Sequence, residues 1–231
     1  MKKVIITGTS TGIGNAIAKN LLKQNVTVIG ISRKHTIKHK NYFAIFFDLN
    51  DVRNIKKILD DIIFNHKKID AIISSAGYGV FENLENLKEK EVIDFFNVNL
   101  LAHILISKIL VSHFKKKKTG HFIFIGSEAS LKGNQKSTLY SAAKHGLLGF
   151  VKSFREECNK SEIRVTIINP GMVNSSFFKK LKFSPGKSIK NSIKLEDIAE
   201  LVFFILKSNP NINYNDIYLS PIKKVINFKN N

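Results

Sequence analysis

Short, continuously apolar runs alternate along this chain with longer stretches of helical periodicity, and this alternation most constrains the fold. The short runs, rich in β-branched and aromatic residues, occupy residues 4–6, 26–31, 42–47, 69–73, 122–125, 165–168 and 216–219. Helical spacing of apolar residues runs through 13–22, 52–64, 87–114, 138–158 and 195–206. Strands that are apolar throughout are typical of a parallel sheet covered on both faces. The pattern predicts a doubly wound, three-layer α/β/α fold.

The chain length of 231 residues suits one well-buried domain. No linker, internal repeat or low-complexity segment divides it, so we expect a single domain over residues 1–231. Residues 174–192 lack clear periodicity and contain Pro185-Gly186. A loop of that length is usually functional or mobile. We therefore expect a substrate-binding loop at about 172–193.

The single cysteine, Cys158, excludes an internal disulfide and any multi-cysteine metal site. His35 and His39 are four residues apart, but no acidic or cysteine ligand lies near them, so no metal site is predicted. No uninterrupted apolar run approaches the roughly 18 residues of a membrane span. We expect a reduced, cytoplasmic protein without a membrane partner.

A formal charge of +19 raises the question of an anionic partner, since Lys and Arg total 37 against 18 Asp and Glu. The basic residues are spread along the chain, and the one dense run is Lys115–Lys118. A position just before Gly120 is typical of a helix C-terminus, where cations complement the helix dipole. No basic patch with interleaved aromatic residues or zinc-finger spacing is present. We therefore predict no nucleic-acid partner and attribute most of the charge to solvated surface.

A glycine-rich turn between the first apolar run and the first helix predicts a dinucleotide site. Gly8 permits a tight turn, Gly12 lets the backbone approach a pyrophosphate, and Gly14 lets the helix pack closely on the strand. The free N–H groups of the helix N-terminus favour the negative phosphates. The predicted contacts are Gly8, Ser10, Thr11, Gly12, Ile13 and Gly14.

The end of the second apolar run bears on which dinucleotide binds. An acidic residue there would hydrogen-bond the adenosine ribose of NAD, but this chain has Ser32 and Arg33. An arginine in that position pairs with a 2′-phosphate. The sequence predicts a preference for NADP(H), with NAD(H) as the other possible cofactor.

Tyr140 and Lys144 are four residues apart near the start of a predicted helix and so share one face. A free tyrosine, with a pKa near 10, transfers protons poorly at neutral pH. A neighbouring ammonium together with an oxidised nicotinamide would favour the phenolate and lower that pKa. Small side chains at 141–143 leave room for a cofactor against this face.

Taken together, the motifs of the chain resemble those of the short-chain dehydrogenase/reductase family over nearly its whole length. The matches are residues 7–14 to the glycine motif, Asp48-Leu49 to the Asp-hydrophobic pair, 74–77 to the Asn-Asn-Ala-Gly motif, Asn99 to the helical asparagine, Ser127 to the catalytic serine, Tyr140 and Lys144 to Tyr-x-x-x-Lys, and Pro170-Gly171 to the Pro-Gly motif, with Ser175 where threonine is frequent. Ser127 precedes Tyr140 by thirteen residues, the spacing usual in the family.

The resemblance implies a Rossmann fold and hydride transfer between nicotinamide and a carbonyl or secondary alcohol. Tyr140 would be the general acid/base, Ser127 would bind the carbonyl oxygen, Lys144 would bind the nicotinamide ribose, and Asn99 would hold a relay water. The cofactor contacts that it implies, beyond the glycine turn, are Ser32, Arg33, Asp48, Leu49, Ser75, Ala76, Gly77, Tyr140, Lys144, Pro170, Gly171, Val173 and Ser175.

Two departures from the family pattern affect the expected role. Ser74-Ser75 replaces the usual paired asparagines that tie neighbouring strands together. The C-terminal Tyr218-Leu219-Ser220-Pro221 replaces the Gly-Gly ending frequent in ketoacyl reductases, which argues against a fatty-acid synthesis role without excluding it.

The family also implies a homodimer or homotetramer, because the long helix and the tyrosine-bearing helix often form its dimer interface. Leu147, Phe150 and Phe154 are the candidates for that surface, and Ile104, Leu105, Lys108, Ile109 and Ser112 are candidates for the core face of the long helix.

Three functions follow from the sequence. The first is an NADP(H)-preferring oxidoreductase acting on a small-molecule carbonyl or alcohol. The second is a non-catalytic NAD(P)-binding regulatory protein of the same fold, against which the intact Ser127, Tyr140 and Lys144 argue. The third is an anion-binding module for RNA or membrane, which predicts strongly salt-dependent binding.

Overall fold

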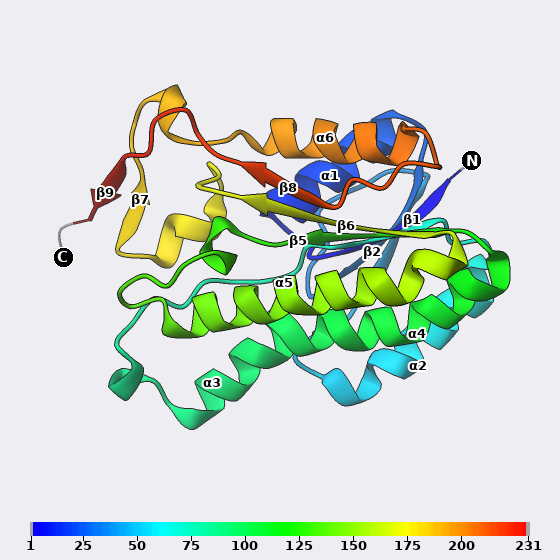
Figure 1. Cartoon of the computed structure of the whole chain (residues 1–231), viewed down its shortest axis with the longest axis horizontal. Coiled ribbons are helices and arrows are strands. Elements are labelled where there is room, and N and C mark those ends of the chain that lie inside the picture. Colours follow the sequence, from blue (N-terminus) through cyan, green and yellow to red (C-terminus); the bar gives the residue numbers. More distant parts are fainter. Residues whose placement is uncertain (1, 230–231) are drawn as a thin grey trace.

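Seven parallel strands form the central sheet in a computed structural model that describes residues 2–229, the side chain of Lys180 excepted (Figure 1). Their order across the sheet is β3-β2-β1-β4-β5-β6-β8. Their bounds are β1 Lys3–Thr7, β2 Thr27–Ser32, β3 Tyr42–Phe46, β4 Ala71–Ser74, β5 Gly120–Ile125, β6 Ile163–Pro170 and β8 Asp216–Leu219. The strand order reverses between β1 and β4, and the carboxyl ends of strands at such a switch point form a ligand-binding crevice.

Helices cover both faces of this sheet, which confirms the predicted doubly wound Rossmann fold (Figure 1). On one face α1 (Gly12–Lys23) packs beside α6 (Leu195–Lys207). On the other lie α2 (Ile55–His66), α4 (Ala102–Lys117) and α5 (Thr138–Cys158). Each helix layer buries its apolar stripe against one side of the sheet, so a large hydrophobic cluster forms on each side.

The long helix predicted over residues 87–114 is interrupted. It consists of α3 (Glu89–Phe96), a π-helical turn (Asn97–Leu101) and α4. A π-turn inserts one residue and rotates everything that follows around the axis. The predicted core face of α4 is wrong in part: Lys108 and Ser112 are exposed, whereas Leu105 and Ile109 pack against the core cluster. The buried side chains of α4 are Ala102, His103, Ile106, Ser107, Leu110 and Phe114.

By length and composition alone, the segment Glu89–Lys117 could cross a membrane, its most apolar stretch having a mean hydropathy of 1.6. In the fold, its inner face is instead buried against the sheet and α2, with Ile106, Leu110 and Phe114 in the core cluster. Its last turn carries Lys115–Lys117, and Lys118 follows in the left-handed conformation. The lysine run thus lies at a helix C-terminus, as predicted.

A second, two-stranded sheet was not expected from the sequence. Strands β7 (Phe183–Pro185) and β9 (Ile226–Phe228) pair antiparallel, which joins the expected loop to the C-terminal segment (Figure 1). Strands of three residues are too short to show an alternating pattern, and β7 also ends in a proline, so periodicity could not reveal them. The remaining short elements are 3₁₀ turns at Val52–Asn54, Leu84–Asn86, Glu128–Ser130, Asn159–Ser161, Ser176–Lys180 and Ile189–Asn191.

Candidate active site

A cavity of about 1510 Å³ opens at the carboxyl ends of the strands. It is lined by every residue that the sequence predicted for the site. Those residues are Gly8, Ser10, Thr11, Gly12, Ile13, Gly14, Ser32, Arg33, Asp48, Leu49, Ser75, Ala76, Gly77, Asn99, Ser127, Tyr140, Lys144, Pro170, Gly171, Val173 and Ser175. Segments that are far apart in the sequence thus line the same cavity.

The glycine turn after β1 has a backbone that only glycine permits. A Cβ on Gly14 would lie 2.5 Å from the carbonyl oxygen of Gly8, so the start of α1 packs directly on the turn. Gly8, at φ +78°, lies so close to Ala76 that an added Cβ would be 2.9 Å from its Cα. Gly12 has φ +63° with no atom within 4 Å of the Cβ position, so its backbone faces open space. This cradle of exposed backbone at a helix N-terminus fits a dinucleotide pyrophosphate.

Thr7 links β1 to the end of β4. Its Oγ1 accepts hydrogen bonds from the backbone N–H groups of Ser75 and Ala76, at 3.0 and 3.1 Å. The Ser74 and Ser75 hydroxyls are buried without a partner among residues 2–229. The strands are therefore joined by Thr7, and the serines that replace the family's asparagines do not make this link.

Arg33 and Asp48 face each other where β2 and β3 end. The Arg33 Nη1 lies 3.8 Å from Asp48 Oδ2, and 76% of the Arg33 side chain is exposed. Such an exposed, long ion pair contributes little stability. The guanidinium lines the cavity edge, and because this pair is weak and exposed, it remains accessible to a further anion.

Tyr140 and Lys144 project into the cavity from the first turns of α5, with the Lys144 ammonium 5.8 Å from the centre of the tyrosine ring. Burial raises the pKa of the Tyr140 phenol, and the Ser127 hydroxyl acts against that rise. The nearby carboxylate of Glu128 raises the pKa further. The protein alone thus favours the neutral phenol, so the predicted lowering of this pKa does not come from Lys144 by itself.

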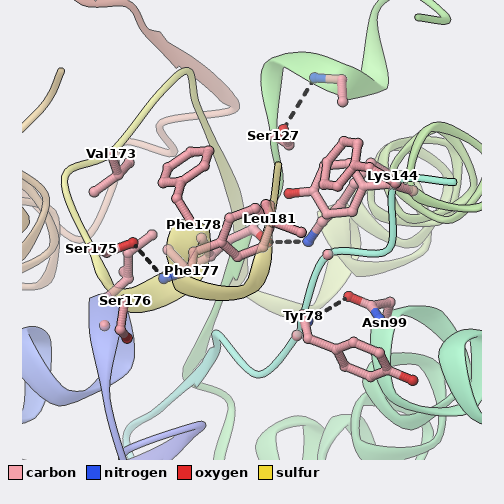
Figure 2. A pocket seen from close by; sticks show the side chains of 18 of the residues that line it. Tyr78, Asn99, Ser127, Lys144, Val173, Ser175, Ser176, Phe177, Phe178 and Leu181 are labelled. Atoms are coloured by element: carbon pink, nitrogen blue, oxygen red, sulfur yellow. Dashed lines mark hydrogen bonds between the residues drawn. The ribbon is translucent and has the colours of Figure 1, made fainter. Parts of the chain in front are cut away.

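Lys144 is 5% exposed and donates a hydrogen bond to the Ile125 carbonyl at 3.1 Å (Figure 2). Burial lowers the pKa of its ammonium to about 8. Burial, with a smaller effect from the Lys144 charge, also lowers the pKa of His103 to about 3. His103 therefore stays neutral, and its Nε2 bonds the Ala76 carbonyl at 3.0 Å.

Asn99 lies in the π-turn, fully buried, and both ends of its amide are bonded. Its Nδ2 donates to the Phe95 carbonyl at 3.1 Å. Its Oδ1 accepts from the Tyr78 N–H at 3.1 Å (Figure 2). A Cβ on Gly77 would lie 2.8 Å from that Oδ1. The π-turn thus aims Asn99 at the segment after β4 and fixes the backbone there.

Ser127 follows β5, and its conformation depends on a residue that the sequence did not indicate. The buried Asn169 of β6 accepts the Ser127 N–H through Oδ1 at 3.2 Å. The Ser127 Oγ accepts the Ala129 N–H at 3.1 Å (Figure 2). The pairing of β5 with β6 therefore positions the serine.

The other end of the cavity is aromatic. Phe81 packs against Tyr140 at 5.2 Å between ring centres, and Phe177 lies 5.8 Å from the same ring. Phe183 meets Phe81 at 4.9 Å. In Figure 2, Val173, Ser175 and Ser176 lie at one side of the view and Lys144 at the other, with Phe177 and Leu181 between them. The loop that was expected to bind substrate thus faces the tyrosine.

A model of the short chain dehydrogenase family matches residues 2–184. The chain belongs to this family. Its enzymes are NAD(P)-dependent oxidoreductases, and this chain is one of them.

Relatives support the assignment. The chain is 32% identical over 213 residues to a 3-oxoacyl-(acyl-carrier-protein) reductase FabG of Buchnera aphidicola, which covers 87% of each chain. It is 29% identical to carbonyl reductase family member 4 of Xenopus laevis, over 90% of this chain and 92% of that one. A solved alcohol dehydrogenase of Thermococcus sibiricus, complexed with 5-hydroxy-NADP, superposes with TM-score 0.85 at 25% identity, over 96% and 97% of the two chains.

Several cavity residues of this short-chain dehydrogenase come from a segment that the sequence did not single out. Lys224, Ile226, Phe228 and Lys229 line the cavity from the C-terminal side. Their only sequence signal is an apolar pair two residues apart, which is too short to interpret.

The proposed dimer surface on α5 needs correction. Leu147 and Phe154 are buried in the core of the subunit, and Phe150 packs against that core. Leu147 and Phe154 are therefore unavailable to a partner, because they cover the sheet. A homodimer or homotetramer, and a cytoplasmic location, stay predictions.

Three further residues with reactive side chains lie outside the cavity lining. His35 bonds the Tyr42 hydroxyl and the Ile45 carbonyl, and within residues 2–229 no group of three potential ligands could hold a metal. His145 bonds the Ser141 carbonyl. Cys158 is buried, which raises the pKa of its thiol to about 11.

Proposed function

We propose that this short-chain dehydrogenase is an NADP(H)-preferring enzyme that transfers hydride between nicotinamide and a carbonyl or secondary alcohol, with Tyr140 as the general acid/base. One observation carries the proposal: Ser127, Tyr140 and Lys144 line the same cavity as the glycine turn. A dinucleotide whose phosphates lie at the turn would extend along this cavity toward the tyrosine.

Each residue of the proposed catalytic group has its own role. When bound, the nicotinamide supplies the hydride or accepts it. The neutral Tyr140 phenol, whose pKa burial raises, is the proton donor to the developing alkoxide in reduction. Ser127 donates a hydrogen bond to the same oxygen and stabilises its charge. Lys144 offers its remaining N–H groups to ribose hydroxyls, while Asn99 orders the backbone after β4.

The test of the mechanism is Tyr140→Phe, which keeps the ring packing against Phe81 and removes only the hydroxyl. Turnover should fall by about 10²–10⁴-fold because the general acid is lost. Cofactor affinity, measured by fluorescence titration, should stay within a few fold. Tyr214→Phe is the matched control, because Tyr214 does not line the cavity, and it should keep full activity. Retained turnover in Tyr140→Phe would refute the role.

The cofactor preference rests on Arg33, whose exposed guanidinium lies at the cavity edge beside Asp48. A charge-assisted hydrogen bond to a 2′-phosphate contributes about 1.5–3 kcal/mol, or about 10- to 100-fold in affinity. The Thermococcus enzyme's complex with 5-hydroxy-NADP supports the same preference. Arg33→Ala should therefore lower kcat/KM for NADPH by that factor and leave NADH unchanged. Lys34→Ala, an exposed neighbour outside the cavity lining, is the control. Equal use of both cofactors by the unaltered enzyme would contradict the proposal.

The names of the relatives support carbonyl reduction, since they include a 3-oxoacyl reductase and a carbonyl reductase. A panel of ketones, 3-oxo esters and secondary alcohols, assayed with both cofactors, would identify the substrate class. Cofactor binding without turnover of any member would instead support the regulatory alternative.

A further inference from the structure

The C-terminal segment Ile222–Lys229, here named the C-terminal strap, lies against the expected substrate loop. Its β9 pairs with β7, placing Phe228 opposite Phe183 and Ile226 opposite Pro185. Backbone bonds continue on both sides of this ladder. The Gly186 N–H donates to the Val225 carbonyl at 2.9 Å, and the Lys229 N–H donates to the Lys182 carbonyl at 2.8 Å.

Side chains add to this attachment at both ends of the loop. The Lys229 ammonium donates to the Phe178 carbonyl at 2.6 Å. The Asn191 Nδ2 donates to the Lys223 carbonyl at 2.9 Å. The loop that carries Phe177 and Phe183 is therefore hydrogen-bonded to the strap at several points.

The strap is also fixed to the catalytic side of the cavity. Lys224 forms an ion pair with Glu128, the residue that follows Ser127. A Cβ on Gly171 would lie 3.2 Å from both Glu128 Oε2 and Pro221 Cδ, so the three segments meet there. The Lys224–Glu128 pair thus joins the outer wall of the cavity to the serine turn.

Two large apolar side chains of the strap line the cavity with little protein covering them. Ile226 and Phe228 are both cavity-lining, and Phe228 is 78% exposed. Apolar area of that size gains free energy when a ligand removes it from water. The aromatic rings of Phe81, Phe177 and Phe183 continue the same apolar surface toward Tyr140.

We propose that the C-terminal strap determines specificity for the apolar part of the substrate. It clamps the loop 172–193 in place, and Ile226 and Phe228 form the outer wall against which an alkyl or aryl chain attached to the carbonyl lies. This inference rests on the proposed function. It predicts that long, apolar carbonyl compounds are preferred over short ones.

The wall is tested with Phe228→Ala in the full-length enzyme, using 2-nonanone and 2-butanone as long and short ketones. KM for 2-nonanone should rise about tenfold, as expected for the loss of part of a phenylalanine contact, and KM for 2-butanone should stay within twofold. Ile222→Ala is the matched control, since Ile222 is 89% exposed on the same segment but does not line the cavity. An equal change for both ketones, or no change, would overturn the proposal.

The clamp is tested by hydrogen exchange, which needs no turnover. Lys224→Ala should speed exchange of the Gly186 and Lys229 amides, whose acceptors across the ladder are the Val225 and Lys182 carbonyls. Lys223→Ala removes an adjacent lysine that makes no ion pair among the described residues, and it should have no effect. Unchanged exchange in Lys224→Ala would overturn the clamp.

A separate measurement distinguishes failure of the strap proposal from failure of the proposed function. Calorimetric binding of 2-nonanone requires no catalysis, so an enzyme that binds this ketone through Phe228 yet never reduces it would refute only the reaction. If Phe228→Ala dissociates an oligomer in gel filtration and leaves ketone binding unchanged, the exposed wall is a contact between copies of the chain, and the strap proposal is wrong.

Discussion

Lys144→Met in the cofactor-free enzyme should stabilise the fold while it removes activity. The charged ammonium is 5% exposed and makes one protein hydrogen bond, to the Ile125 carbonyl. Its pKa falls from 10.5 to about 8, which corresponds to about 3 kcal/mol of destabilisation of the charged form. Methionine has a similar shape and no charge. Leaving the Ile125 carbonyl without its donor costs about 1 kcal/mol, so the net gain near neutral pH is about 2 kcal/mol.

For a chain of this size, that gain corresponds to a rise in Tm of about 4–8 °C. The pH dependence isolates the lysine. Below pH 8 both the folded and the unfolded states hold its proton, so the full penalty is present. Between pH 8 and 10.5 the folded state has released the proton and the unfolded state retains it, so the stability of the unaltered enzyme rises with pH. The gain is about 2 kcal/mol between pH 7 and 9.5.

Urea unfolding at pH 7 and pH 9.5 measures both effects. The advantage of Lys144→Met should be clear at pH 7 and should nearly vanish at pH 9.5. Lys57→Met, which alters an exposed lysine of α2, controls for effects of pH on the rest of the molecule. A Lys144→Met variant that is less stable at pH 7, or whose advantage does not depend on pH, would refute this account of the buried charge. Turnover should fall at least 100-fold in the same variant, because the residue proposed to bind the nicotinamide ribose is lost.

Two further outcomes follow from the packing. Gly14→Ala should destabilise the enzyme by about 1–3 kcal/mol in urea unfolding, because its Cβ would lie 2.5 Å from the Gly8 carbonyl oxygen, a backbone atom that cannot rotate away. Gly12→Ala meets no atom within 4 Å and bears only the strain of its positive φ, about 1 kcal/mol, so equal losses in the two variants would contradict the packing argument. The buried Cys158 thiol, whose pKa is raised to about 11, should react with a disulfide reagent only on unfolding, and rapid modification of the folded enzyme would show that this part of the core opens.

Local sequence patterns predicted most of the scaffold because their physical causes are local. Continuously apolar strands need cover on both faces, and helical periodicity places a stripe against the sheet. The helix over 138–158 and the strand over 216–219 have the predicted bounds. The glycine turn was predictable for the same reason, since positive φ at Gly8 and Gly12 is a property of the residues themselves.

Tertiary structure decided features that depend on contacts between distant segments. The π-turn at Asn97–Leu101 rotates α4 relative to α3. A prediction that assumes one constant helical period along the chain cannot detect such an inserted residue. The hydroxyl of Thr7, and not those of Ser74 and Ser75, links β1 to the end of β4, which is possible because these two strands are neighbours.

What the sequence by itself determined was the sheet, its covering helices and the residue types of the site, since each follows from backbone freedom or the spacing of apolar residues. Only the folded chain decided the protonation of Tyr140 and Lys144, because their pKa values depend on how deeply neighbouring segments bury them. It also decided the wall of the substrate end. There β9 pairs with β7, although about forty residues separate them in the chain. Such a long-range pairing forms only when the rest of the fold holds the two strands side by side.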